Sequence, residues 1–303
     1  MLVFGHKNPD TDTICSALVM AHLQNKLGHE AKAVRLGDLN KETQYALDHF
    51  QMEAPALLEG SVSHQDVILV DHNEFGQSAE GIEEATIKMV VDHHRIANFQ
   101  TAEPLFFRAE PVGCTATILY KMFKENGIEV DVKMAGLMAS AIISDSLLFK
   151  SPTCTPEDEK ACRELAVIAG IDLDVYGMDM LKAGTDLSDY SAGQLLGIDA
   201  KVFPMGAATV EIAQINTVSI TDMLARKGEL EEQMQAIISE KGLDLFVAVI
   251  TDILNSNSQI IALGNRTDIV EKGFQVQLVE NTALLEGVVS RKKQIVPVMD
   301  KIA

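Results

Sequence analysis

The sequence has 303 residues, of which 47% are hydrophobic and 23% are charged. These shares are those of a globular protein, and the length is sufficient for two domains that each bury a core. The 25 basic and 44 acidic residues give a formal net charge of −19. This charge argues against a long nucleic acid as a partner and favours cations. No apolar run is long enough to suggest a membrane span, and no signal peptide is expected. The four cysteines form no CxxC pair, so we expect a protein of the reducing cytoplasm.

The first expected strand covers residues 1–4 and runs into the segment GHKNPDTD. Pro9 cannot donate a backbone hydrogen bond, so this segment is predicted to be a loop at the end of the strand. A helix should follow, with Asp12 or Thr13 as its cap. Open α/β sheets bind ligands at such strand-to-helix turns. Helix capping would explain one acidic residue here but not the whole group, which consists of His6, Asp10 and Asp12.

Two later segments share one design. A strand over residues 66–70 runs into Asp71-His72-Asn73, and a strand over residues 87–91 runs into Asp92-His93-His94. Short runs rich in β-branched residues are typical of buried parallel strands. We therefore expect these acids and imidazoles at the sheet edge that carries His6. The other elements expected in this part of the chain are a strand over 31–36 and helices over 42–50, 115–126, 132–143 and 155–170.

The alternation of strands and helices up to residue 187 predicts an α/β domain with a doubly wound parallel sheet. The polar residues 188–193 are predicted to be a linker. Residues 194–303 are then a smaller C-terminal α/β domain with a mixed sheet. Its expected elements are strands over 209–215, 246–250 and 260–263, and a long helix within 220–241.

The candidate ligands share a position near predicted strand or helix ends, and they are His6, Asp10, Asp12, Asp71, Asp92, His93, His94 and Asp145. Several carboxylates at one sheet edge repel one another unless cations lie among them. Two divalent ions would balance four carboxylates, so the composition suggests a dinuclear metal site. Mixed imidazole and carboxylate ligands suit Mn, Co, Zn or Fe better than magnesium alone. Each residue taken singly could be structural, and His72 in particular could simply orient its loop.

The segment Ser290-Arg291-Lys292-Lys293-Gln294 is the densest basic patch of an acidic chain. An arginine offers a planar fork that matches phosphate, and a lysine adds a compact charge. A solvated basic run usually has no specific function. Beside a predicted metal site, however, phosphate binding becomes the favoured interpretation. Lys201 is a weaker candidate from its chemistry alone.

Four motifs taken together resemble the family II inorganic pyrophosphatases of the DHH phosphoesterase superfamily. They are HKNPDTD at 6–12, DHN at 71–73, DHH at 92–94 and SRKKQ at 290–294. DHH alone marks only the superfamily, whereas its combination with SRKKQ is specific. The resemblance extends over nearly the whole chain and includes Asp145. It implies a cytoplasmic, homodimeric enzyme that hydrolyses pyrophosphate to two orthophosphates between two domains that close around the substrate.

The resemblance also implies roles for individual residues. One metal ion would be bound by His6, Asp10, Asp71 and Asp145, and a second by Asp12, Asp71, His93 and Asp145. Asp71 would bridge the two ions, and a hydroxide shared by them would attack phosphorus. The residues expected to bind phosphate and to stabilise charge on the leaving group are His94, Lys201, Arg291 and Lys292. Asp92 would orient an imidazole from behind the ligands. Two Mn²⁺ or Co²⁺ ions per subunit are expected, with additional Mg²⁺ arriving with the substrate.

Two other functions remain as alternatives. The first is a phosphodiesterase of the same superfamily that acts on short oligonucleotides or cyclic dinucleotides. Such relatives usually carry a glycine-rich GGGH-type motif in the second domain, which this sequence lacks. The second is a non-catalytic sensor of metal or phosphate, which would usually have lost a ligand. Every expected ligand position is filled, so pyrophosphate hydrolysis is the preferred hypothesis.

Overall fold

The computed structural model describes residues 1–303, which form two compact units, Met1–Gly184 and Thr185–Ala303. In the first unit six strands form a parallel sheet in the order β3-β2-β1-β4-β5-β6. The order of the strands changes direction between β1 and β4, and sheets of this kind bind ligands at that point. The strands are β1 Leu2–Phe4, β2 Lys32–Arg35, β3 Ala56–Leu57, β4 Asp66–Val70, β5 Thr86–Asp92 and β6 Phe106–Ala109.

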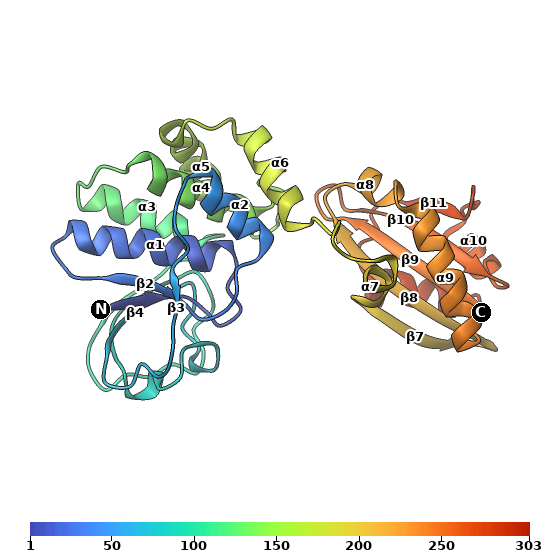
Figure 1. The fold of residues 1–303 in the computed structure, drawn as a ribbon, viewed down its shortest axis with the longest axis horizontal. Helices are drawn as coiled ribbons and strands as arrows, with labels where there is room; N and C mark the ends of the chain where they lie inside the picture. The colour runs from blue at the N-terminus through green and yellow to red at the C-terminus, as the bar shows by residue number, and fades with distance from the viewer. The chain divides into compact units, whose positions relative to one another are not determined.

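Helices cover one face of this sheet. Helices α1 and α3 pack against the strands, and α4 packs against both helices (Figure 1). Helix α1 begins with Asp10 as its cap, whose side chain accepts a hydrogen bond from the Thr13 amide. The prediction that Asp12 or Thr13 caps this helix is therefore wrong, and the Asp12 carboxylate is available for other contacts. The helices of this unit are α1 Thr11–Lys26, α2 Lys41–His49, α3 Thr115–Glu125, α4 Val132–Ser146, α5 Pro156–Ala169 and α6 Leu173–Gly184.

The opposite face of the sheet is covered by connecting segments. Phe4, Val67, Leu69 and Val90 are buried against residues of these segments, among them Ile82. The connection between β4 and β5 contains two short 3₁₀ turns and no α-helix. The predicted α/β class with a parallel sheet is confirmed. The expected regular alternation of strands and helices, however, does not hold beyond β4.

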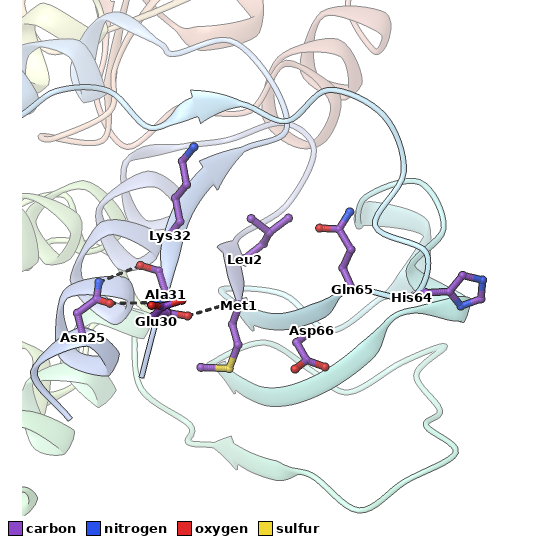
Figure 2. Close-up of a pocket in the computed structure, with 9 residues that line it drawn as sticks. All are labelled: Met1, Leu2, Asn25, Glu30, Ala31, Lys32, His64, Gln65 and Asp66. Carbon is purple, nitrogen blue, oxygen red and sulfur yellow. Dashed lines mark hydrogen bonds between the residues drawn. The ribbon is translucent and has the colours of Figure 1, made fainter. Parts of the chain in front are cut away.

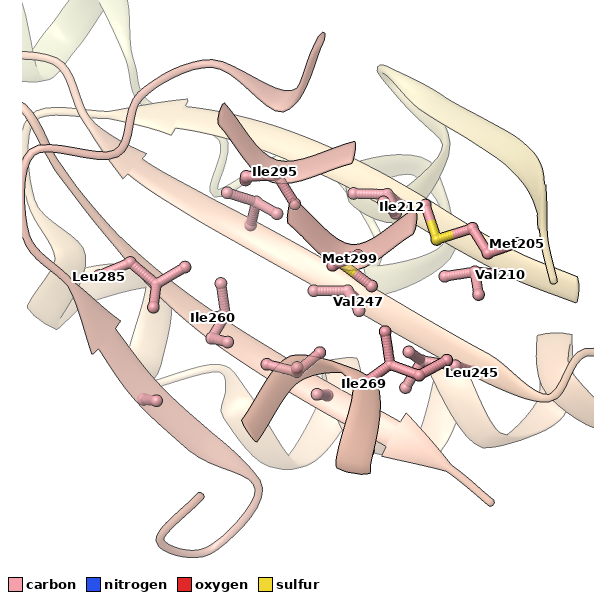
Figure 3. Packing of buried hydrophobic residues seen from close by; sticks show 14 of the residues in the cluster. Met205, Val210, Ile212, Leu245, Val247, Ile260, Ile269, Leu285, Ile295 and Met299 are labelled. Atoms are coloured by element: carbon pink, nitrogen blue, oxygen red, sulfur yellow. The ribbon is translucent and has the colours of Figure 1, made fainter. Parts of the chain in front are cut away.

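The second unit contains a mixed sheet in the order β11-β10-β9-β8-β7, in which only β8 and β9 are parallel. Its strands are β7 Ala200–Met205, β8 Ala208–Thr217, β9 Leu245–Asp252, β10 Asn257–Gly264 and β11 Thr282–Leu285. Figure 3 shows one buried face, where Ile212, Val247 and Ile260 pack with Ile295 and Met299. The predicted smaller α/β domain with a mixed sheet is confirmed.

Helices lie on both faces of the second sheet. The long helix expected within residues 220–241 is present as α9, but it begins only after a separate short helix, α8. The break is held by Arg226, whose guanidinium donates to the carbonyl oxygens of Leu187 and Tyr190. No helix of either unit combines the length and the apolar composition needed to cross a membrane. The helices of the second unit are α7 Ala192–Gly197, α8 Ile220–Leu224, α9 Lys227–Lys241, α10 Asp268–Phe274 and α11 Val296–Asp300.

Candidate metal centre

The predicted ligands of the first unit come together at the carboxyl ends of its central strands. His6 and Asp10 follow β1, Asp71 follows β4, and His93 follows β5. Asp145 reaches the same region from the last turn of α4. The ligand atoms form three groups, each with mutual distances within 4.8 Å, namely His6–Asp10–Asp71, Asp71–His93–His94 and Asp12–His93–Asp145.

Asp71 is the residue common to two of these groups, and its two carboxylate oxygens face different imidazoles. Oδ2 lies 3.4 Å from His6 Nε2, and Oδ1 lies 3.3 Å from His93 Nε2. His6 Nε2 is also 3.4 Å from Asp10 Oδ2. Two ligands of one small divalent ion, each about 2.1 Å from it, are about 3 Å apart when they are adjacent. These distances therefore suit an ion on each side of Asp71.

Asp145 supplies a second observation that fits a cation. Its Oδ2 atom is buried and has no hydrogen-bond partner. A buried carboxylate oxygen without a partner is costly, and a bound cation removes that cost. Asp12, which is 1% exposed, and His93 are the neighbours of Asp145 in this group.

The pKa values of the site reflect an excess of buried negative charge. Burial and the charge of Asp71 raise the pKa of Asp12 to about 7. Burial and the charges of Asp12 and Asp71 raise the pKa of Asp145. Burial alone would lower the pKa of His6, but Asp10 and Asp71 outweigh it and raise the pKa to about 10. The pKa of each of these three groups is thus shifted toward the protonated form by the surrounding carboxylates, and the donor set fits divalent metal ions of the manganese type.

Hydroxyl and amide groups behind the ligands hold the carboxylates in place, and the sequence reasoning missed them. Thr13 Oγ1 donates to Asp71 Oδ2 at 2.6 Å, and Ser16 Oγ donates to Asp12 Oδ1 at 2.6 Å. The Thr115 amide donates to Asp12 Oδ2 at 2.7 Å. Such partners orient metal ligands and raise their affinity for the ion. The spacing of Asp12 and Ser16, one helical turn apart, is a signal that could have identified this pair.

Glu42 on α2 joins two of the elements that carry ligands. It accepts a hydrogen bond from Thr11 Oγ1 at 2.7 Å and another from Ser144 Oγ. Thr11 lies between Asp10 and Asp12 in the sequence, and Ser144 precedes Asp145. Burial raises the pKa of the Glu42 carboxyl group. Glu42 therefore links the start of α1 to the end of α4.

Three residues beside the ligands have distinct internal partners. His72 is buried, its Nδ1 donates to the Val70 carbonyl oxygen at 2.9 Å, and its Nε2 accepts from Ser78 Oγ at 3.1 Å. Because both ring nitrogens are engaged, His72 supports its loop and is not available to a metal ion. Asp92 Oδ1 lies 3.0 Å from His94 Nδ1 and also accepts from the His94 amide. Asp92 thus orients the His94 ring, which is about half exposed.

A hollow of about 160 Å³ opens beside the centre and has a polar and charged lining, formed by His6, Asp71, His72, Asn73, Glu74, Gln77, His94 and Arg95. A larger hollow of about 770 Å³ lies at the opposite, amino-terminal ends of β1, β2 and β4 (Figure 2). There Asn25 hydrogen-bonds to Ala31, and the Met1 amine donates to the Glu30 carbonyl oxygen. No predicted ligand lines the larger hollow, so the small one is the candidate substrate site.

The basic residues predicted in the second unit lie near one another within that unit. The Arg291 guanidinium donates from Nη2 to Asp199 Oδ1 at 2.7 Å and from Nη1 to the carbonyl oxygens of Asp199 and Ile212. Lys201 follows Asp199 by two residues and pairs with Ile212 in the β7–β8 ladder. Lys292 is exposed. Arg291 itself is only 7% exposed, which differs from the solvated basic turn considered as an alternative.

The parallel sheet, its switch point and a carboxylate shared by two groups of potential ligands are typical of an α/β protein that binds divalent metal ions.

Comparisons with known proteins identify the family within this class. Residues 1–142 match the DHH family N-terminal domain, and residues 178–302 match the DHHA2 domain. The chain is 62% identical over 299 residues to a Brevibacillus brevis protein named "Probable manganese-dependent inorganic pyrophosphatase", with 98% of this chain and 96% of that one covered. It is 60% identical over 300 residues to the "Manganese-dependent inorganic pyrophosphatase" of Bacillus subtilis, with 99% and 97% covered.

A solved structure is similar over the full length. This crystal structure from Methanococcus jannaschii, assigned to the family II inorganic pyrophosphatases, has 37% sequence identity and a TM-score of 0.63, with 100% of this chain and 99% of that one covered. The chain therefore belongs to the family of manganese-dependent inorganic pyrophosphatases, and the family predicted from the motifs is confirmed.

Proposed function

We propose that this chain hydrolyses inorganic pyrophosphate to two orthophosphates at a centre of two Mn²⁺ or Co²⁺ ions. In this reaction one water is consumed, and its oxygen bonds to one phosphorus. The bond between that phosphorus and the bridging oxygen breaks, and the bridging oxygen leaves with the other phosphate. The observation that carries the proposal is the Asp71 carboxylate, which presents one oxygen to His6 and the other to His93. The family relationship gives the substrate, since the relatives at about 60% identity are named for pyrophosphate hydrolysis.

The residues fall into two ligand sets under this proposal. His6, Asp10 and Asp71 would hold one ion, because their ligand atoms form one close group. The second ion would be held by Asp12, Asp71, His93 and Asp145. Asp145 groups with Asp12 and His93, which supports its place in the second set, and it would also contribute to the first set, as the resemblance implies. When bound, two such ions lower the pKa of water and polarise phosphoryl oxygens.

The side chains proposed to bind pyrophosphate are His94 of the first unit and Lys201, Arg291 and Lys292 of the second. The Asp92 carboxylate accepts the Nδ1 proton of His94, which leaves Nε2 on the opposite side of the ring for a phosphate oxygen. The hydrogen bond to Asp92 is the main cause that raises the pKa of His94, and a protonated ring can donate from Nε2. Lysine and arginine groups would neutralise charge that develops on the departing phosphate. Additional Mg²⁺ would accompany the substrate.

The alternative substrates fit less well. The hollow of about 160 Å³ suits a small anion better than an oligonucleotide or cyclic dinucleotide. A net charge of −19 also opposes the approach of a longer polyanion. We extend the proposal to a homodimer in the cytoplasm, where the four free cysteines would stay reduced.

The test of this function compares metal ions and substrates in one assay of phosphate release. Metal-free protein should regain pyrophosphate hydrolysis with Mn²⁺ or Co²⁺ and should run severalfold slower with Mg²⁺ alone, because imidazole ligands favour the transition metals. Chelation should suppress the activity. A full rate with Mg²⁺ alone would contradict the transition-metal assignment. Faster cleavage of a dinucleotide than of pyrophosphate would favour the phosphodiesterase alternative.

A further inference from the structure

The end of the loop between β6 and α3, together with Thr115 at the start of α3 (residues 112–115), contacts three of the proposed ligands. The Val112 carbonyl oxygen lies 3.1 Å from His93 Nδ1 and accepts its proton. The Thr115 amide donates to Asp12 Oδ2, and Thr115 Oγ1 donates to Asp71 Oδ1 at 3.2 Å. The position of this loop therefore sets the orientation of the His93 ring. It also sets the position of one carboxylate oxygen of Asp12 and one of Asp71.

A single buried carboxylate holds both this loop and the first turn of α3. Asp158 is 0% exposed and lies on α5. Its Oδ2 accepts from the Gly113 amide at 2.8 Å, and its Oδ1 accepts from Thr117 Oγ1 at 2.6 Å. A Cβ atom at Gly113 would lie 2.8 Å from Asp158 Oδ2 and 3.0 Å from the Thr153 carbonyl oxygen. The backbone thus approaches the carboxylate as closely as only glycine permits.

Helix capping accounts for only part of what Asp158 does. The Thr155 amide and hydroxyl donate to Asp158 Oδ2, and the Asp158 amide donates back to Thr155 Oγ1, which forms a capping box at the start of α5. Capping requires no contact with Gly113 or Thr117, which lie more than 40 residues earlier in the chain. Those two contacts join α5 to the loop that touches the ligands.

We infer that Asp158 is a positioning residue of the metal centre. It touches neither an ion nor the substrate, and it acts by fixing the loop whose Val112 and Thr115 groups orient His93, Asp12 and Asp71. Residues that contact metal ligands directly typically change metal affinity about 10- to 100-fold when they are removed, and Asp158 acts one contact further away, so we expect an effect at the lower end of that range. The inference rests on the proposed ligand sets, so its test measures metal binding separately from activity.

The experiment titrates Mn²⁺ into metal-free protein by calorimetry and records the melting temperature of each variant. Asp158→Ala should weaken Mn²⁺ binding about tenfold, the lower end of that range. Thr155→Ala is the matched control, because it damages the same cap but leaves both contacts of Asp158 with the loop. It should lower the melting temperature and keep Mn²⁺ affinity within about twofold of the original chain. Asp158→Asn should largely retain affinity, because an amide can accept from Gly113 and donate to Thr117 Oγ1.

A milder substitution, which removes only one hydrogen bond, keeps the inference testable if Asp158→Ala does not fold. Thr117→Val removes only the Oδ1 contact and should weaken Mn²⁺ binding about two- to tenfold, as the loss of one hydrogen bond does. At saturating Mn²⁺, kcat of these variants should return toward that of the original chain. Equal Mn²⁺ affinity in the original chain, Thr117→Val and Asp158→Ala would overturn the positioning role while leaving the proposed function intact. Failure of the original chain to bind Mn²⁺ at all would instead refute the metal centre on which both rest.

Discussion

Asp71→Asn is expected to lower turnover by more than about 10²-fold, the upper end of the effects seen for partners that lie behind metal ligands. The expectation follows from the position of Asp71, whose two oxygens face His6 and His93. Asparagine has the same shape but replaces one oxygen with an NH₂ group, which cannot bind a cation. At least one of the two proposed ions should therefore be lost.

Asparagine is also the substitution that changes the backbone least. Asp71 has a φ of 58°, in the left-handed region, which asparagine and aspartate tolerate better than most residues. A loss of activity in Asp71→Asn thus cannot be attributed to strain at this position.

The measurement combines metal content by elemental analysis with turnover on pyrophosphate. Asp92→Asn provides the control, because Asp92 is equally buried at the end of the neighbouring strand but contacts His94 and Asn73. That control should still bind two ions. Two bound ions together with near-normal turnover in Asp71→Asn would rule out a bridging role for Asp71.

The strand-end residues of the site could be predicted because their signal is local. Each acid or imidazole group follows a short apolar strand directly, and carboxyl ends of parallel strands share one edge. The partners behind them could not be found in this way. Thr115 reaches Asp12 over 103 residues of sequence, and Asp158 reaches Gly113 over 45. Such contacts depend on tertiary packing, which no local pattern encodes.

Two short strands at the edges of the first sheet also escaped prediction. β3 has 2 residues and β6 has 4, and both lie at the edges of the sheet. Such segments are too short to show the alternation of apolar and polar residues that identifies a strand. Helix α6 was missed as well, although its residues are buried against α2 and α4. Gly177 lies within this helix, and glycine and small polar residues follow it, so the sequence gives only a weak helix signal there.

The end of α4 shows a conformation that propensity would not suggest. Leu147, Leu148 and Phe149 have φ values of 48°, 51° and 66°, although non-glycine residues avoid this region at a cost of about 1–2 kcal/mol each. The Ser146 hydroxyl accepts from the Phe149 amide, and the Leu148 amide donates to the Ile143 carbonyl oxygen. The strained turn directly follows the segment that carries Asp145, and strain of this kind concentrates at functional sites.

Arg291→Ala is expected to lower kcat/KM about 10²- to 10³-fold, as the loss of a charge-stabilising donor does. Arginine has five N–H donors, and the internal bonds of Arg291 use two on Nη1 and one on Nη2. Nε–H and one Nη2–H have no part in these bonds. We expect these donors to bind a phosphate oxygen while the guanidinium stays in contact with Asp199.

The control separates phosphate binding from the internal role of this arginine. Asp199→Ala removes the ion pair but keeps the guanidinium, which the two carbonyl oxygens still hold. If Arg291 binds phosphate, Asp199→Ala should retain activity within severalfold, whereas Arg291→Ala should lose it. Mn²⁺ content should stay unchanged in both variants, because neither removes a proposed ligand. A change of less than about twofold in Arg291→Ala would instead assign Arg291 a purely structural role, since most substitutions away from a site have effects of that size. Arg291→Lys should also fall well short of the original rate, because an ammonium group cannot hold the two carbonyl oxygens and present a planar pair of donors at once.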